Sequence, residues 1–79
     1  MARVLLFGRL SDLAGWRERE IPADSLAALK GRLATEEPAL FEALQAPGVR
    51  VAVDQALVGA DTPLRPGSEV AFLPPMSGG

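Results

Sequence analysis

The residue types that most enzymes use for covalent or acid–base chemistry are missing from this chain. Its 79 residues include no cysteine and no histidine. A cysteine nucleophile, a disulfide framework and a thiolate metal site are therefore excluded. The commonest general base and the commonest metal ligand are absent as well. The composition predicts no metal site and argues against catalysis by this chain alone.

The group that could react instead is the α-carboxylate of Gly79, which the sequence places at the end of a stiff arm. Two prolines favour an extended backbone, and six extended residues reach about 20 Å. Glycine lets a backbone pass through a channel too narrow for a Cβ. The sequence therefore predicts that Gly79 reacts, with Gly78 beside it. The remaining residues of the arm, which are expected to contact the partner that it enters, are Pro74, Pro75, Met76 and Ser77.

A terminal carboxylate needs activation, because it is ionised at neutral pH and is a poor electrophile. Adenylation by ATP in a partner enzyme would make it an acyl anhydride, and sulfide could then displace AMP to leave a thiocarboxylate. The ATP would belong to that partner, and no cofactor is expected on this chain. The alternative is that Gly78 and Gly79 are an inert, frayed end, as is common at termini.

The first third of the chain predicts two strands. The apolar run of residues 3–7 predicts a central strand buried on both faces. A short helical turn is expected at residues 9–14, ending at Gly15. The charges that alternate through residues 16–21 are typical of an edge strand that avoids foreign partners.

Two helices are expected next. Leu26, Leu29 and Leu33 recur at spacings of three and four, which predicts one apolar stripe on a helix from Ser25 to Glu36. Pro38 can begin a second, short helix. The buried face of that helix would consist of Leu40, Phe41 and Leu44.

The last third predicts strands again. Residues 49–53 alternate between valine and other residues, which indicates a half-buried strand. A short strand at 56–58 and a final apolar strand at 70–73 follow. Turns are expected at 54–55 and 66–67.

This order of elements predicts an α+β fold, a β-grasp with a mixed sheet and helices on one face. The first and last strands would lie side by side at the centre. We expect a β-grasp domain over residues 1–73 and an extended tail over 74–79. Some apolar residues of the central strands must then face away from the helices. Loops could cover them, or they could form a patch for a protein partner.

Charge and hydropathy set limits on the partners. The net charge is −2, and a single lysine accompanies seven scattered arginines, so no nucleic-acid partner is expected. The apolar run Val4–Phe7 stops at Gly8 and is too short for a signal peptide or a membrane span. We therefore expect no membrane association and a cytoplasmic location.

Three segments resemble the MoaD/ThiS family of ubiquitin-like sulfur carriers. They are residues 53–58, 62–64 and 67–79, of which the last reads Gly-Ser-Glu-Val-Ala-Phe-Leu-Pro-Pro-Met-Ser-Gly-Gly. The N-terminal residues 4–8 fit the family more loosely. Two residues depart from the family pattern: Asp54 stands where asparagine is usual, and Ser68 stands where aspartate is usual.

The resemblance implies a ubiquitin-like β-grasp fold and the sulfur-carrier role of a molybdopterin synthase subunit. Gly79 would be adenylated, converted to a thiocarboxylate and used to donate sulfur to cyclic pyranopterin monophosphate in molybdenum cofactor biosynthesis. The implied partners are an adenylating enzyme related to ubiquitin-activating enzymes and the large, catalytic synthase subunit. Two carriers and two large subunits would form a heterotetramer. Phe7, Leu57 and Leu73 lie where the family contacts the large subunit, which also receives the tail.

Three alternatives remain at this point. The chain could carry sulfur for thiazole synthesis or tRNA thiolation, although the double proline resembles the molybdopterin branch more closely. It could also be a ubiquitin-like protein modifier that is conjugated to lysines through Gly79. The last alternative is a plain interaction domain with an inert tail.

Overall fold

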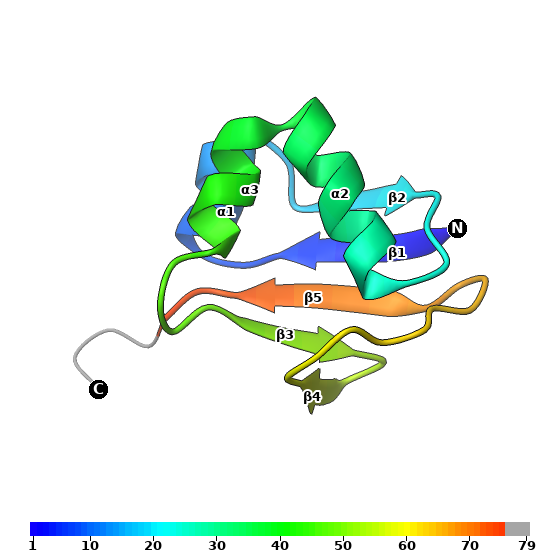
Figure 1. The fold of residues 1–79 in the computed structure, drawn as a ribbon. Helices are drawn as coiled ribbons and strands as arrows, with labels where there is room; N and C mark the ends of the chain where they lie inside the picture. Colours follow the sequence, from blue (N-terminus) through cyan, green and yellow to red (C-terminus); the bar gives the residue numbers. More distant parts are fainter. Residues whose placement is uncertain (76–79) are drawn as a thin grey trace.

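The computed structural model of the chain describes residues 1–75, which form five strands and three helices (Figure 1). In chain order the elements are β1 (Ala2–Leu6), α1 (Arg9–Ala14), β2 (Glu18–Ile21), α2 (Leu26–Glu36), α3 (Pro38–Leu44), β3 (Arg50–Val53), β4 (Ala56–Val58) and β5 (Glu69–Leu73).

The five strands form one mixed sheet in the order β2-β1-β5-β3-β4. β1 and β5 run parallel at its centre, with Val4 opposite Val70 and Leu6 opposite Phe72. The other three pairings are antiparallel. The first and last strands therefore lie side by side, and the predicted β-grasp fold is confirmed (Figure 1).

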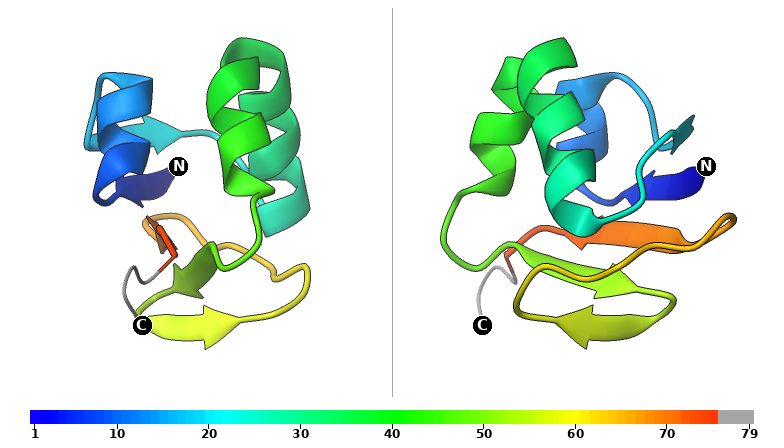
Figure 2. Two further views of the ribbon diagram at one scale, coloured as in Figure 1. Left: turned by 90° about the vertical axis from the view of Figure 1, so that its left-hand side faces the viewer. Right: turned by 45° about the vertical axis from the view of Figure 1, so that its right-hand side comes forward.

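All three helices lie over one face of the sheet, and the hydrophobic core fills the space between the two layers (Figure 2). The predicted stripe of α2 is confirmed, because Leu26, Leu29 and Leu33 are all buried. In α3 only Leu40 and Leu44 are fully buried. The sheet contributes Val4, Leu6, Val53, Val70 and Phe72 to this core.

Four strands differ in extent from the prediction, β1, β3 and β5 by one residue and β2, described below, by two. β1 begins one residue earlier and is not buried on both faces, because Arg3 is exposed and Leu5 is only half-buried. β3 begins one residue later than predicted, and β5 one residue earlier. The prediction that β1 is buried on both faces failed for a general reason. A run of apolar residues does not show which of two faces a helix layer covers.

β2 is shorter than predicted because Trp16 makes a tertiary contact before the strand starts. Its indole Nε1 donates to both carboxylate oxygens of Glu37, at 3.0 and 3.1 Å. The Arg19 guanidinium donates to the same carboxylate at 2.6 Å and lies 5.4 Å from the centre of the Trp16 ring. Glu37 separates α2 from α3, so this cluster ties edge strand β2 to the helices.

The two predicted turns are confirmed by their backbone geometry. Asp54 and Gln55 both have positive φ, 49° and 71°, as a two-residue hairpin between β3 and β4 requires. At the second turn, the Ser68 amide donates to the Arg65 carbonyl at 2.9 Å, and Gly67 has φ 84°. Within residues 1–75, no helix is long and apolar enough to cross a membrane.

Candidate functional site

Pro74 and Pro75 continue the chain directly after β5 and are half-buried. They lie against two loops, the β1–α1 loop at Gly8 and the α3–β3 loop at Gly48. A Cβ built on Gly8 would lie 3.0 Å from Cγ of Pro74, and one built on Gly48 would lie 3.0 Å from Cβ of Pro75. The predicted site residues Met76, Ser77, Gly78 and Gly79 lie outside the described residues.

The sheet face away from the helices, called the open face below, carries an apolar row that crosses four strands. Leu5 of β1 pairs with Ala71 of β5, which pairs with Ala52 of β3, which pairs with Leu57 of β4. Paired residues point to the same face of a sheet. The two central alanines, Ala52 and Ala71, are buried, so the exposed apolar surface of the row comes from its ends, Leu5 and Leu57. Leu73 lies further along β5 on the same face, toward the tail.

Three of the residues predicted to contact a partner, Phe7, Leu57 and Leu73, lie on the open face or at its tail end. Leu57 has 60% of its surface exposed, and Leu73 is half-buried. Phe7 follows Leu6, whose partner is Phe72, so it lies at the same end of the sheet as Leu73. Phe7 is 45% exposed. Exposed large apolar side chains gathered on a face that no helix covers are typical of a protein-binding surface.

Charged side chains border the apolar row. Arg3, on the open face of β1, donates to Glu69 at 2.9 Å and lies 3.8 Å from Glu18. At the other end of the face, Arg50 pairs in register with Leu73. An apolar centre with a polar rim is the usual composition of a docking surface.

The two residues that depart from the family pattern contact each other. Asp54 Oδ1 accepts from the Glu69 backbone amide at 2.9 Å, and Ser68 Oγ donates to Asp54 Oδ2 at 3.5 Å. Ser68 Oγ also accepts from the Arg65 amide at 2.8 Å. The contacts join the β3–β4 hairpin to the start of β5. An aspartate at position 68 would place a second carboxylate beside that of Asp54. A serine avoids this repulsion and can donate a hydrogen bond to Asp54 instead.

We expect the single substitution Ser68→Asp to lower the free energy of unfolding by about 1–3 kcal/mol, because it buries a charge beside a like charge. The double substitution Asp54→Asn with Ser68→Asp should recover most of that loss, since an asparagine amide can donate to the new carboxylate. Urea unfolding of the two single variants and the double variant measures the coupling. Additive effects would show that the two positions are independent.

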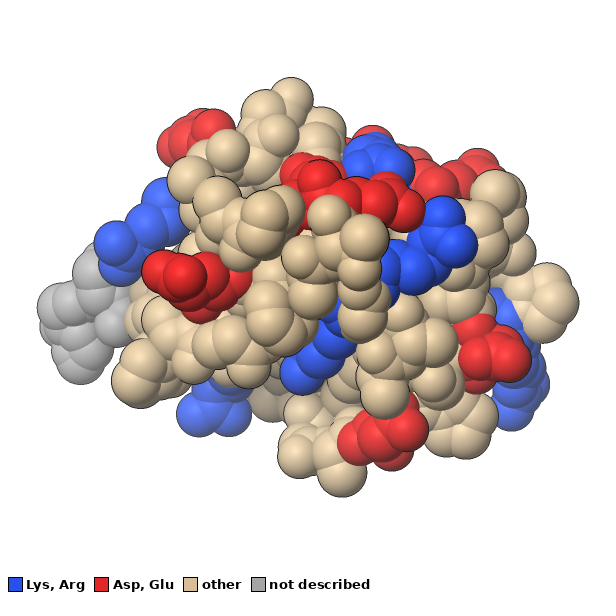
Figure 3. All heavy atoms as spheres, turned by 45° about the horizontal axis from the view of Figure 1, so that its top comes forward, with Lys and Arg blue, Asp and Glu red and all other residues tan. Residues whose placement is uncertain are grey.

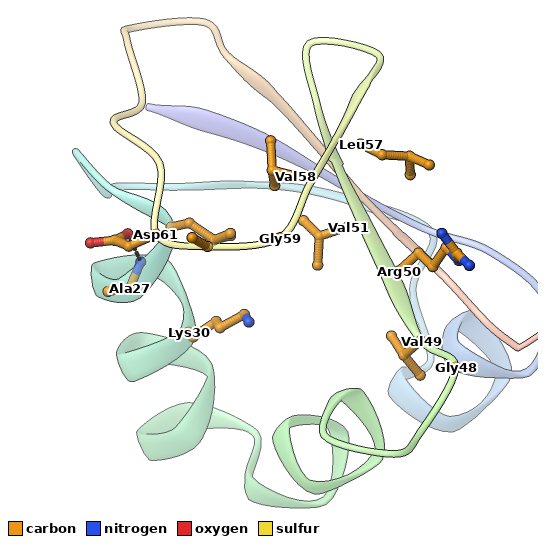
Figure 4. A pocket seen from close by; sticks show the side chains of 12 residues that line it. Ala27, Lys30, Gly48, Val49, Arg50, Val51, Leu57, Val58, Gly59 and Asp61 are labelled. Carbon is orange, nitrogen blue, oxygen red and sulfur yellow. Dashed lines mark hydrogen bonds between the residues drawn. The ribbon is translucent and has the colours of Figure 1, made fainter.

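A hollow of about 620 Å³ lies between α2 and the β3–β4 hairpin (Figure 4). Val51 and Val58 point into it and Lys30 reaches over it from α2, whereas Arg50 and Leu57 point away from it. The Asp61 carboxylate at its rim accepts from the Ala27 amide at 2.8 Å and so caps α2. Two cationic residues line the hollow, Lys30 and Arg50, together with the Asp61 carboxylate, which already accepts a hydrogen bond.

The described part of the chain holds no group of three acidic, histidine or cysteine side chains that could bind a metal ion. On the helix-bearing side, acidic and basic side chains are mixed (Figure 3). The described surface viewed there therefore shows no field of one sign that would attract a polyanion.

Sequence reasoning missed part of this site. The small residues Ala52 and Ala71 complete the apolar row, and strict alternation along β3 and β5 was the signal that could have identified them. The sequence around Gly8 and Gly48 does not indicate that these glycines contact the prolines. Their role depends on a contact with prolines that are distant in the sequence.

Comparison with known proteins agrees with this geometry. The sequence model of the ThiS family matches residues 4–79. The molybdopterin synthase sulfur carrier subunit of Escherichia coli (strain K12) is 38% identical over 81 residues, which cover 100% of both chains.

Two solved structures share the fold. The small archaeal modifier protein 1 from Methanosarcina acetivorans has a TM-score of 0.86 at 22% identity, covering 99% of this chain and 95% of its own. A complex of subunits 1 and 2 of the molybdopterin-converting factor from Helicobacter pylori contains a chain with a TM-score of 0.74 at 25% identity. That match covers 99% of this chain and 97% of the other.

Proposed function

Because the chain belongs to the ThiS family, we propose that it is the sulfur-carrier subunit of a molybdopterin synthase. The observation that carries the proposal is the 38% identity to the Escherichia coli carrier subunit along the full length of both chains. The structure supports it with a β-grasp fold, an open apolar face, and two prolines that lead from the central strand β5 toward Gly78 and Gly79.

In the proposed reaction Gly79 is the reacting residue. Its carboxylate oxygen attacks the α-phosphorus of ATP bound to a partner adenylating enzyme, which forms an acyl-adenylate and releases pyrophosphate. Hydrosulfide then attacks the carbonyl carbon, and the bond to AMP breaks. The products are the thiocarboxylate, AMP and one proton. This chain contributes the carboxylate and the arm, and it needs no cofactor of its own.

The large, catalytic subunit is the second proposed partner, and it would receive the tail and transfer the sulfur to cyclic pyranopterin monophosphate. We assign the open face, with Leu57, Leu73 and Phe7, as the surface that docks on it. An apolar row with a charged rim suits a lasting contact between subunits. A binding partner would also add to the apparent stability of so small a domain. Pairing of two such units gives the proposed heterotetramer.

A mass measurement tests the proposal. The protein is incubated with its adenylating enzyme, ATP and a sulfur source, and its intact mass is recorded. We expect an increase that equals the replacement of one oxygen by one sulfur. Addition of the large subunit and the pterin precursor should then yield molybdopterin and return the carrier to its original mass. An unchanged mass while AMP accumulates would contradict the sulfur-carrier function.

A further inference from the structure

Resting on the proposed function, we propose that Gly8 and Gly48 are positioning residues that seat Pro74 and Pro75 and so set where the reactive arm leaves the fold. We call these two glycines the proline seat. The two loops that contain them are 40 positions apart in the sequence (48 − 8) and converge on the end of β5.

Each seat residue combines a backbone conformation and a contact that a side chain would disturb. Gly8 has φ 58° and Gly48 has φ 89°, conformations that residues with a Cβ rarely adopt. A Cβ at either position would lie 3.0 Å from a proline carbon. Ordinary carbon–carbon contacts are about 3.5–4.0 Å. The proline ring can therefore rest on each loop only because the loop carries a glycine there.

Hydrogen bonds hold both loops in place. The Gly8 carbonyl accepts from the Ser11 hydroxyl at 2.8 Å and from the Ser11 amide at 3.2 Å. Beside Gly48, the Val49 amide donates to the Ala46 carbonyl at 3.2 Å. The two turns flank the chain as it leaves β5, because Gly8 follows β1 and Gly48 precedes β3, the two neighbours of β5 in the sheet. Such a seat should restrict the motion of the prolines about Leu73.

With the seat, the last fixed residue before the free end of the arm is Pro75 and no longer Leu73. If the arm pivoted at Leu73, its six residues would reach about 20 Å, whereas the four residues after a seated Pro75 reach about 13 Å. The end of the arm is then confined to about a quarter of the volume, which raises its effective concentration at a partner's active site. The seat should therefore act on the turnover of the arm and leave the binding of the folded domain to the partner enzyme unchanged.

Matched glycine substitutions separate this role from backbone strain. Gly15 and Gly67 have similar positive φ values, 82° and 84°, but nothing lies within 4 Å of a Cβ built on either. Gly15→Ala, Gly67→Ala and Gly48→Ala should thus share a comparable strain, and only the last displaces a proline. With the adenylating enzyme and ATP, and the carrier as varied substrate, pyrophosphate release gives kcat and KM for each variant.

We expect Gly48→Ala to lower kcat about 10- to 100-fold, with KM changed less than about threefold. Both controls should keep kcat within about twofold of wild type. In a Pro75→Gly background there is no ring left to displace, so adding Gly48→Ala should change kcat by less than about twofold. Equal losses of kcat in Gly48→Ala and the controls, or the same further loss in the Pro75→Gly background, would overturn the seat.

An NMR measurement tests the seat without any activity. Nuclear Overhauser contacts between the Gly48 α-protons and the Pro75 ring protons should be present in the wild-type protein and lost in Gly48→Ala. Their absence from the wild type would disprove the seat even if sulfur loading is intact. Their presence in a protein that is never adenylated would uphold the seat and contradict the proposed function.

Discussion

We expect deletion of Gly79 to stop thiocarboxylate formation while the domain keeps its stability. The deletion shortens the arm by about 3.5 Å. In the proposed reaction the carboxylate of Gly78 would then fall short of the ATP bound by the partner enzyme. A misplacement of about 1 Å can already cost a factor of about 100 in rate, so we expect sulfur loading to fall at least 100-fold. Intact mass after reaction with the adenylating enzyme, ATP and a sulfur source gives the loaded fraction.

The control for this deletion is a glycine substitution elsewhere. Gly31 lies exposed within α2, and nothing lies within 4 Å of a Cβ built on it. Gly31→Ala should load sulfur like the wild type and raise the free energy of unfolding by up to about 1 kcal/mol, because alanine favours the helix. Thermal unfolding of the Gly79 deletion should match that of the wild type. Undiminished loading of the shortened chain would rule out Gly79 as the reacting residue.

We expect replacement of Leu57 by aspartate to weaken binding to the proposed partner, the large synthase subunit, by about 30- to 1000-fold, or about 2–4 kcal/mol. Leu57 ends the apolar row of the open face and is 60% exposed, so the free protein should tolerate the change. In the complex the new carboxylate would be buried against apolar groups without a cation to pair with it. Isothermal titration calorimetry with the large subunit measures the loss.

Leu13→Asp is the matched control, because Leu13 is 52% exposed and lies on α1, on the other side of the sheet. This variant should bind the large subunit within about threefold of the wild type. Both variants should unfold within about 0.5 kcal/mol of the wild type, as is usual for surface substitutions. Equal binding of the Leu57 and Leu13 variants would show that the open face is not the docking surface.

The features that sequence periodicity could predict are the ones that depend on local spacing. Leu26, Leu29 and Leu33 repeat at helical spacing, and all three are buried in α2. The turn at Asp54 and Gln55 was predictable as well, because polar residues there separate two apolar segments. Element types and their order were therefore correct, and the errors at strand ends amount to one or two residues.

The features that could not be predicted depend on contacts between distant segments. Trp16 lies outside β2, and its indole donates a hydrogen bond to Glu37, which is 21 positions later in the sequence. The proline seat needs the ends of β1, α3 and β5 to meet at one place, and no window of sequence contains all three. The contact between Asp54 and Ser68 is of the same kind, since it depends on the strand pairing of β3 with β5.

The fold does not by itself separate a sulfur carrier from a protein modifier. The archaeal modifier protein shares the fold at a TM-score of 0.86 with only 22% identity. The 38% identity to the Escherichia coli carrier subunit favours sulfur transfer. Detection of this chain joined to lysines of other proteins through Gly79 would favour the modifier, or a double role. Carriers for thiazole synthesis and tRNA thiolation are distinguished by which acceptor takes up the sulfur.

The parallel pairing of β1 with β5 has a consequence for biosynthesis. Arg3 and its partner Glu69 are 66 positions apart, so the N-terminal strand has no central neighbour until the last strand has been made. At about 5–20 residues per second, the ribosome needs roughly 3–13 s to cover that distance. During this interval the apolar residues of β1 must be kept from aggregating. The nascent chain can complete its core only when β5 emerges, and the reactive arm follows directly behind that strand.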